Sequence, residues 1–419
     1  MARVTIDNVE SGMKLARDVV NARGQVLIPA GSTLEDRQLR GLKIWGVKAV
    51  FVEGSALSDS DVDGEARVLS PQAREEIENH IAYKFSLNEG NLDHPLLVEL
   101  KKLSFVYLEG IGAPKDSLIT NVMEGNLEKS SLSELETSSL TVEELLQKSQ
   151  TVASPPDIYS KLLNVMKKPS SSAKDIAEVI SNDPGLTARL LRIVNSAFYA
   201  FPSKIETVSR AITIIGTNEL TDLVLATSVL TSFDGSLDAV VSMEKFWKHS
   251  LSCGFISRAI AQQRHEQNLE RFFVTGLLHD IGRLLVLSSF PKRFELASNK
   301  SVQEKIPLVA AEKEVLGFTH CEVGSALMKT WNLPISQQEA VGYHHKPQFS
   351  RRFPIDSSVV HIADVCINAI GIGSSGSSLV PQFIPEAWDR INVDISSITK
   401  IAEDVETHVE DLMEIVFSK

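Results

Sequence analysis

The stretch FFVTGLLHDIGRLLVL (residues 272–287) decides the fold expected for this chain. It is apolar on nearly every side of a helix, which is typical of a helix buried in a protein core. His279 and Asp280 interrupt the apolar run. Because an unpaired charge in a core is strongly destabilising, Asp280 needs a partner in the folded chain. The stretch therefore predicts a helical core that encloses a polar site.

The regions on both sides of this stretch also have helical patterns. Asn182-Asp183-Pro184 places a capping Asp before a Pro at the first helical position, and apolar residues follow at helical spacing. A last helix is expected over about residues 395–416, beyond a flexible GIGSSGSS loop at residues 371–378. Few alternating β-branched runs occur, so residues 140–419 are predicted to form a nearly all-helical domain.

The first 54 residues have a different pattern of apolar residues, and this pattern predicts a small α/β module. Apolar runs at residues 13–20, 25–29 and 48–53 are typical of strands. Ser32-Thr-Leu-Glu35 fits a capping box that would open a helix through Trp45. Residues 55–139 are expected to be a linker with helical segments at about 71–85 and 94–109.

Charge and composition exclude several classes of protein. The formal net charge is −12, with 42 Lys and Arg against 54 Asp and Glu, which argues against a broad nucleic-acid surface or an anionic membrane as partner. The N-terminus lacks the apolar segment of a signal peptide, and no uninterrupted apolar run reaches the roughly 18 residues of a spanning helix. Three cysteines without a CxxC pair do not predict a disulfide framework. A cytoplasmic protein of bacterial type is expected.

Histidines and aspartates on predicted helices form the candidate site. They are His249, His279, Asp280, His320, His344, His345 and Asp364. Imidazole and carboxylate suit iron, manganese, nickel or zinc. In a site with two ions, a bound water becomes a nucleophile at neutral pH. The same side chains can instead satisfy one another by hydrogen bonds without metal, and His344 or His345 can be a surface residue beside a turn.

Five blocks occur in an order that is similar to the HDOD domain, a helical relative of the HD metal-dependent phosphohydrolases. They are DPGLTARLLRIVNSAFY (183–199), AITIIGTNELTDLVLA (211–226), GLLHDIGRLLV (276–286), HCEVGSALMKTWNLP (320–334) and YHHKP (343–347). The resemblance covers about residues 141–364, and the N-terminal module resembles those that precede HD-GYP and HDOD domains. It implies a helical bundle in a bacterial signal-transduction protein, with the metal-site region at residues 245–366.

The resemblance also implies roles for the candidate ligands. His249, His279, Asp280 and Asp364 resemble the ligands of a first ion. His320, His344 and His345 resemble those of a second ion, with Asp280 as the bridge. One or two ions of iron, manganese, nickel or zinc are the implied cofactor.

Three departures from the catalytic relatives argue against hydrolysis. Arg283 stands where HD-GYP proteins have a Lys, and Arg binds phosphate without giving up its proton. The GYP segment is absent, and Lys245 replaces an acid used by some relatives. Asp280 and Arg283 remain the candidate catalytic pair, although Arg283 can equally be a surface or capping residue.

Two functions from different classes follow. The preferred one is a regulatory or binding module with signalling protein partners, in which the metal site holds an ion or a nucleotide-like ligand. The alternative is a phosphohydrolase acting on a nucleotide or cyclic dinucleotide. Cys253, Cys321 and Cys366 each stand near a candidate ligand in sequence; they are either small core residues, which we favour, or thiols beside the metal.

Overall fold

The computed structural model describes residues 2–5, 9, 11–16, 19–20, 26–35, 38–39, 42, 49–53, 69–111, 119, 122, 141–149, 154–196, 198–199, 201, 203–232 and 241–417. Contacts between Cα atoms divide the chain into a unit of residues 1–72 with 200–202, and a unit of residues 73–199 and 203–419. The domain boundaries expected from the sequence, at residues 54/55 and 139/140, stay predictions.

The N-terminal unit is built from short antiparallel strands. A three-stranded sheet has the order β1 (Ala2–Thr5), β5 (Ala49–Glu53), β2 (Lys14–Leu15), and β3 (Val19–Val20) pairs with β4 (Val26–Ile28). The buried core includes Leu15, Ile28, Leu34, Leu42, Val50 and Val52. β4 and β5 confirm the strands expected near residues 25–29 and 48–53, whereas the run at residues 13–20 is divided into β2 and β3, which belong to different sheets. β1 is an addition that the sequence pattern did not indicate.

The capping box predicted at Ser32–Glu35 is wrong, because the cap lies three residues later, at Glu35. Thr33 forms an isolated β-bridge with Lys14. The backbone amide of Glu35 donates to Oε1 of Gln38 at 2.9 Å, which is the return bond of a cap centred on Glu35. Most of the remaining predicted helix, including Trp45, lies outside the described residues.

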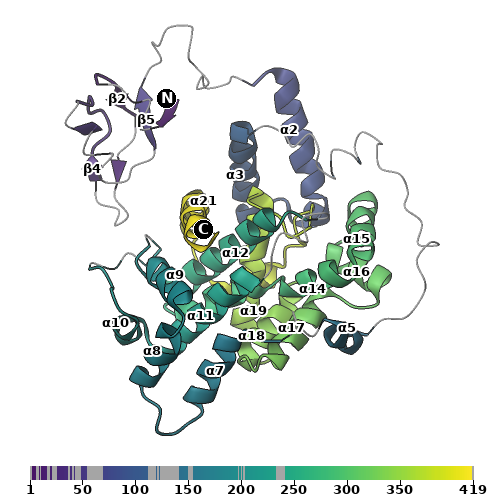
Figure 1. Cartoon of the computed structure of the whole chain (residues 1–419). Helices are drawn as coiled ribbons and strands as arrows, with labels where there is room; N and C mark the ends of the chain where they lie inside the picture. Colours follow the sequence, from purple (N-terminus) through teal and green to yellow (C-terminus); the bar gives the residue numbers. More distant parts are fainter. Residues whose placement is uncertain are drawn as a thin grey trace. The chain divides into compact units, whose positions relative to one another are not determined.

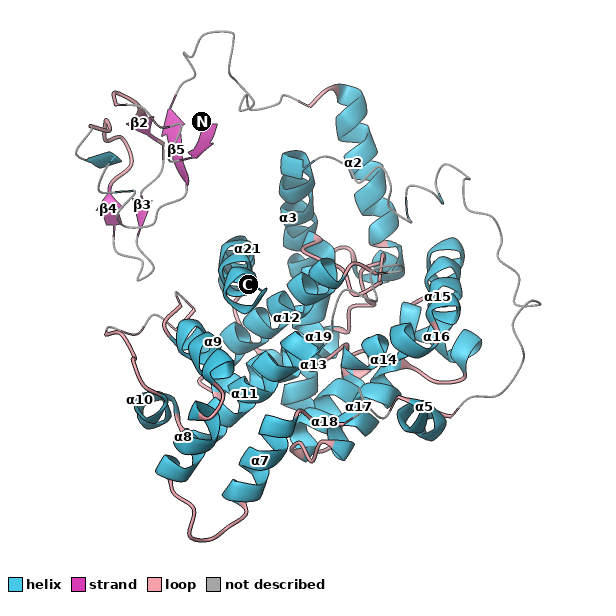
Figure 2. Cartoon of the chain, viewed as in Figure 1, coloured by secondary structure: helices cyan, strands magenta, loops and turns pink. Residues whose placement is uncertain are grey.

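The rest of the described chain is helical (Figures 1 and 2). Its elements are α2 (Pro71–Lys84), η2 (Ser86–Asn91), α3 (Pro95–Ile111), α5 (Val142–Lys148), α7 (Asp157–Met166), α8 (Ala173–Ser181), α9 (Pro184–Val194), α10 (Val208–Ile215), α11 (Thr217–Ser232), α12 (Met243–Gln263), α13 (Leu269–Leu278), α14 (Ile281–Ser289), α15 (Pro291–Glu304), α16 (Leu308–Leu316), α17 (His320–Thr330), α18 (Ile335–Tyr343), η5 (Pro347–Phe349), α19 (Pro354–Ile370), α20 (Pro385–Ile391) and α21 (Ile395–Phe417). The fold is mainly α, as predicted.

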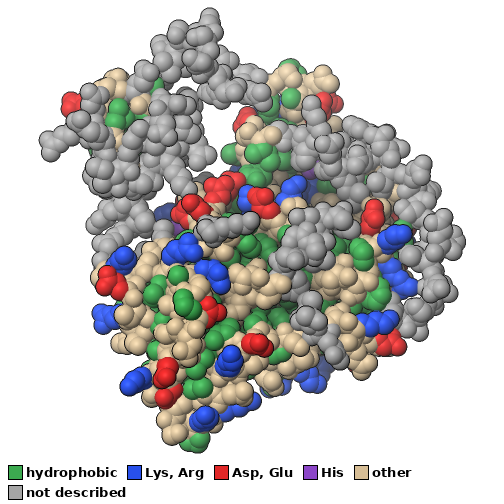
Figure 3. Space-filling view, viewed as in Figure 1, with side chains coloured by type: hydrophobic (Ala, Val, Ile, Leu, Met, Phe, Trp, Pro, Cys, Tyr) green, Lys and Arg blue, Asp and Glu red, His purple; other side chains and the backbone are tan. Residues whose placement is uncertain are grey.

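Local signals set several of these helices where the sequence indicates. The side chain of Asp183 accepts from the backbone amide of Leu186 and Pro184 occupies the first turn of α9, so the predicted cap is confirmed. The predicted last helix is α21, and the two helical segments expected in the linker are α2 and α3. On the face drawn in Figure 3, basic and acidic side chains of the described residues are interspersed.

Two glycines let α12 and α13 approach closely at the centre of the helical body. A Cβ on Gly254 would lie 2.7 Å from the carbonyl oxygen of Phe273, and one on Gly276 would lie 2.8 Å from that of Cys253. Larger residues would therefore force the helices apart. Because α12 carries His249 and α13 leads into His279, this close packing positions two candidate ligands.

Residues 272–287, the apolar stretch that includes His279 and Asp280, belong to two helices. α13 ends at Leu278 and α14 begins at Ile281, with φ −100° and ψ 12° at Asp280. The expected single helix is thus wrong, because the backbone turns at Asp280. Leu269–Ser289 is long and apolar enough to cross a membrane by length and composition, but 89% of its apolar window is buried in the protein, as in a core helix.

Candidate metal centre

A first group of four side chains meets where α12, the α13–α14 turn and α19 converge. The group comprises His249, His279, Asp280 and Asp364. Each residue is at most 2% exposed, and one ligand atom from each lies within 4.8 Å of the others. The sequence placed these residues on three separate segments, and the fold brings them together.

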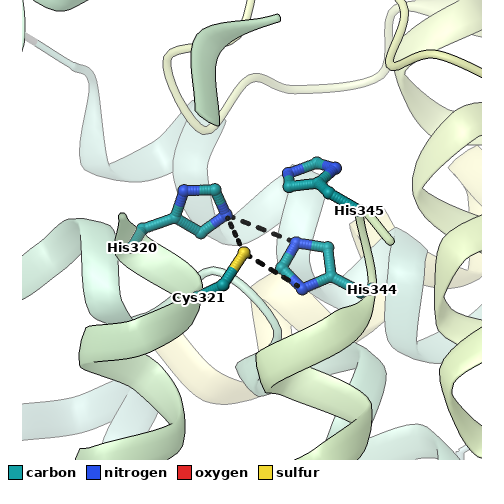
Figure 4. A group of neighbouring side chains, drawn as sticks. All are labelled: His320, Cys321, His344 and His345. Atoms are coloured by element: carbon teal, nitrogen blue, oxygen red, sulfur yellow. Dashed lines mark hydrogen bonds between the residues drawn. The ribbon is translucent and has the colours of Figure 1, made fainter. Parts of the chain in front are cut away.

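A second group of four side chains lies beside the first (Figure 4). It comprises His320 and Cys321 from the start of α17, and His344 and His345 directly after α18. Their ligand atoms again lie within 4.8 Å of one another. A capping box of Thr319 and Glu322 fixes the first turn of α17, so it holds the backbone of His320 and Cys321 in place.

The two oxygens of Asp280 face different groups. Oδ2 lies 3.2 Å from Nε2 of His279 and 3.7 Å from Nε2 of His249. Oδ1 lies 3.1 Å from Nε2 of His320 and 3.7 Å from Nε2 of His344. Asp364 completes the first group, with Oδ1 at 3.4 Å from Nε2 of His249. This is the arrangement that a carboxylate bridging two ions requires.

Hydrogen bonds outside the groups set the imidazole tautomers. Nδ1 of His279 is 2.7 Å from the carbonyl oxygen of Gly276, and Nδ1 of His344 is 2.7 Å from that of Val341. A carbonyl only accepts, so each Nδ1 carries a proton and donates it. In the neutral imidazoles both Nε2 lone pairs then point toward the oxygens of Asp280. Lone pairs facing a carboxylate repel, so either a proton on Nε2 or a metal ion must lie between each imidazole and Asp280.

A buried carboxylate oxygen also fits a bound cation. Oδ1 of Asp280 is buried without a hydrogen-bond partner. Buried polar groups are rarely left unpaired. The donor set of imidazole nitrogens and carboxylate oxygens fits a transition-metal ion, so the residues present fit the implied group.

The carboxylates of the centre are held ionised. Burial raises the pKa of Asp280, but Arg283, His279 and His320 outweigh this and hold it well below its usual range. The pKa of Asp364 is also well below its usual range, because hydrogen bonds to His249 and His279 outweigh burial. Ionised carboxylates are the form that binds a metal ion.

Glu312 and Ser375 support the centre, and the sequence reasoning missed both. Oε2 of the buried Glu312 accepts from Nδ1 and from the backbone amide of His320, at 2.5 and 2.9 Å. Arg283 donates to Oδ2 of Asp280, to Oε1 of Glu312 and, at 2.6 Å, to Oγ of Ser375. Ser375 lies in the loop predicted to be flexible, yet it is fully buried.

A second line of support runs through His361 and Asn368 on α19. Nδ1 of His361 donates to the carbonyl oxygen of His344 at 2.7 Å, and its Nε2 accepts from the backbone amide of Ile384. Asn368 donates to Oδ1 of Asp364 at 2.7 Å. Such outer contacts orient ligands, and their loss weakens metal binding.

The structure decides several alternatives that the sequence left open. Arg283 is 2% exposed and His344 is fully buried, so the surface interpretation of both is wrong. The side chain of His345 is 11% exposed, and its Nδ1 lies 3.8 Å from Oδ2 of Asp364. Lys245, which replaces an acid of some relatives, is exposed.

The three cysteines differ in their relation to the centre. All are buried, but of the three only Cys321 belongs to a ligand group. Its Sγ lies 3.4 Å from Nε2 of His320 and 3.8 Å from Nδ1 of His344. Burial raises the pKa of this thiol, and the two histidines more than offset that and lower it to about 6. Burial raises the pKa of Cys253 and of Cys366.

A cavity of about 640 Å³ adjoins the second group. Its lining includes Arg283, Cys321 and His345, together with the exposed aromatic rings of Tyr343 and Phe349. The members of the first group do not line it. The second group is therefore the side of the centre that a ligand can approach.

A helical body thus encloses this cluster of histidine and aspartate side chains. Residues 152–347 match the model of the HDOD domain family, and the chain therefore contains an HDOD domain. The match ends before Asp364, so α19 adds one candidate ligand from beyond it.

Other known proteins are similar to this chain in sequence or in fold. An uncharacterized protein of Treponema pallidum (strain Nichols) is 26% identical over 197 residues, which are 45% of this chain and only 37% of that protein. An HDOD domain protein of unknown function from Geobacter sulfurreducens is 23% identical, with a TM-score of 0.52 over 65% of this chain and 100% of that chain.

A candidate signal transduction protein from Marinobacter aquaeolei VT8 is 15% identical, with a TM-score of 0.50 over 68% of each chain. Both structural likenesses fall below 25% identity, and they show the fold.

Proposed function

We propose that this protein is a signal-transduction module whose HDOD domain holds two transition-metal ions as a regulatory element. The observation that supports this most directly is the division of the Asp280 oxygens between two groups of imidazoles. His249, His279 and Asp364 would complete the first subsite, and His320, His344 and His345 the second. Iron, manganese, nickel and zinc all suit such donors.

The surroundings of Arg283 favour regulation over hydrolysis. Its guanidinium is buried and donates to Asp280, Glu312 and Ser375. Opposite charges raise its already high pKa further, although burial alone would lower it. A permanently charged group committed to these contacts stabilises the bridging carboxylate but does not deliver a proton.

A second candidate function, a phosphohydrolase acting on a nucleotide or cyclic dinucleotide, is favoured by the cavity beside the second group. Bound metal would supply an activated water and neutralise phosphoryl charge. Arg283 lines the cavity and would bind phosphoryl oxygens, while Tyr343 and Phe349 would contact a base. A buried Asp280 fixed by Arg283 would act as a ligand rather than as a proton donor.

Coupling to signalling protein partners is part of the proposal, in a cytoplasmic setting. A ligand that binds one arrangement of the helices better than another shifts their populations. The three unpaired cysteines of the helical unit suit a reducing compartment such as the cytoplasm.

Because bound metal is proposed to shift the populations of the helix arrangements, addition of metal to chelator-treated protein should change amide hydrogen exchange in α17, α18 and the loop at 371–378.

Metal analysis of the full chain, purified without chelators, tests the central claim. The parent should carry up to two ions per chain, and Asp280→Ala should lose both. Asp364→Asn should lose mainly the first ion and His345→Ala mainly the second. His80→Gln is a matched control, because His80 is a buried histidine on α2, outside both groups. A parent that neither carries nor takes up metal would overturn the proposal.

Turnover distinguishes the two candidate functions. Metal-loaded parent and Asp280→Ala would be incubated with nucleoside phosphates, linear phosphodiesters and cyclic dinucleotides. No turnover with intact metal content supports the regulatory function. Turnover that disappears in Asp280→Ala would establish the phosphohydrolase instead.

A further inference from the structure

We infer that Cys321 binds the second ion directly, which makes the second subsite a mixed thiolate–imidazole site that selects zinc or another thiophilic ion. The inference rests on the proposed function, since it presumes that the centre holds metal. It goes beyond that function by assigning a ligand and a metal class to one of two unlike subsites.

The position of the Cys321 thiol supports the assignment. Its Sγ lies 3.4 Å from Nε2 of His320, and its ligand atom lies within 4.8 Å of those of His320, His344 and His345. Figure 4 shows the sulfur between the rings of His320 and His344, beside Nε2 of His320 and Nδ1 of His344. Atoms that share one ion as ligands must lie within a few ångströms of one another.

An independent observation favours a cation at this subsite. Oδ1 of Asp280 is buried without a hydrogen-bond partner and points into the second group, 3.1 Å from Nε2 of His320. Oδ1 of Asp280 therefore lies beside two imidazoles of the group to which Cys321 belongs. A coordinating thiol is deprotonated by the ion itself, and its proton passes to solvent.

The two subsites differ in donor chemistry. The first offers two imidazoles and two carboxylates, a set that suits harder ions such as manganese or iron. The second offers three imidazoles and a thiolate with only one shared carboxylate oxygen. Thiolate favours zinc over magnesium, calcium and manganese. The geometry thus favours two different ions in one centre.

Access also differs between the subsites. Cys321 and His345 line the 640 Å³ cavity, and none of the four residues of the first group does. The ion held by Cys321 would therefore exchange with solvent more readily than its neighbour. Chelator should remove it first, which allows the two ions to be separated experimentally.

The experiment uses the full chain, stripped of metal and reloaded with Zn²⁺ or Co²⁺. X-ray absorption at the zinc edge of the parent should show a sulfur at about 2.3 Å. The Co²⁺ form should show a sulfur-to-cobalt charge-transfer band in the near ultraviolet. Cys321→Ser and Cys321→Ala should lose this band and bind one ion where the parent binds two. Cys366→Ala is the matched control, since Cys366 is fully buried but outside both groups.

The outcomes separate this inference from the function on which it rests. A parent that binds two ions without any sulfur signal overturns the inference and leaves the metal centre intact. A parent that binds no ion overturns the proposed function itself. Because the absorption measurement is made on the parent, a folding defect in a Cys321 variant does not affect it. Persistence of the band in well-folded Cys321→Ser would also refute the assignment.

Discussion

Replacement of Glu312 by Gln is expected to weaken the second subsite selectively. The Glu312 carboxylate accepts from Nδ1 of His320 at 2.5 Å and from the His320 backbone amide at 2.9 Å. It thereby fixes the tautomer that turns Nε2 toward Asp280. Gln has nearly the same shape but no charge, so the change tests the electrostatic part of this support.

The size of the effect follows from the contacts that are lost. The amide oxygen can still accept both bonds from His320, but the bond from Nδ1 is no longer charge-assisted, and the amide NH2 group cannot accept from Arg283 as Oε1 does. Removal of such an outer partner typically lowers metal affinity about 10- to 100-fold, which corresponds to roughly 1.4–2.7 kcal/mol. Glu312 is linked to the first subsite through Arg283, which donates both to Glu312 and to Asp280.

The assay is a competition titration of Zn²⁺ against a chromophoric chelator, with both dissociation constants fitted. Glu322→Gln is the matched control: Glu322 is a half-exposed glutamate that pairs with Lys313 and caps α17, and Gln preserves the cap. Equal loss at both subsites, or no loss at the second, would refute the argument that Glu312 acts through His320.

Three further predictions concern the scaffold. Gly282→Ala should destabilise the fold by about 1–3 kcal/mol in urea unfolding, because the new Cβ would overlap the carbonyl oxygen of His320; unchanged stability would show that α14 and α17 can separate freely. His361→Phe, which removes the donor to the carbonyl oxygen of His344, should cost about 1–3 kcal/mol in the same assay with chelator present. Burial lowers the pKa of His80 to about 4, so between pH 6.5 and 4 the unfolded chain binds a proton that the folded chain does not. Stability should therefore fall as the pH drops through this window, by at most roughly 3 kcal/mol, and His80→Gln should flatten that part of the profile.

The sequence indicates the candidate ligands because their chemistry is visible in single letters. His and Asp within apolar helices stand out, and all seven converge in the fold. Glu312 was missed because the run Glu312-Lys313-Glu314 resembles a solvated helix face. One signal was available: Glu312 shares helical spacing with the buried residues Leu308 and Val315, which indicates that it faces the core.

The order of the loop at residues 371–378 and the break between α13 and α14 were also not predicted, and the reason is different. Nothing local to GIGSSGSS indicates order, since its glycines and serines are typical of mobile linkers. The loop is ordered by contacts distant in sequence: Ser375 accepts from Arg283, and a Cβ on Gly373 would overlap the backbone of His249. The turn at Asp280 likewise has no Pro or Gly at His279 or Asp280 that would indicate it. We attribute the turn instead to the packing of α14 against α17 and of α13 against α19.

Arg283 stands where the catalytic relatives have a Lys that can transfer a proton. The same Arg contacts the bridging ligand Asp280. A lysine here would place one ammonium beside Asp280, with a proton that it can give up. The guanidinium instead reaches three acceptors at once, in Asp280, Glu312 and Ser375, and so joins the bridging carboxylate to the support of His320 and to the covering loop. A change in this loop would therefore act on the carboxylate that both ions share. In the proposed regulatory metal centre, Arg283 would thus replace an acid catalyst by a contact between the bridging carboxylate and the covering loop.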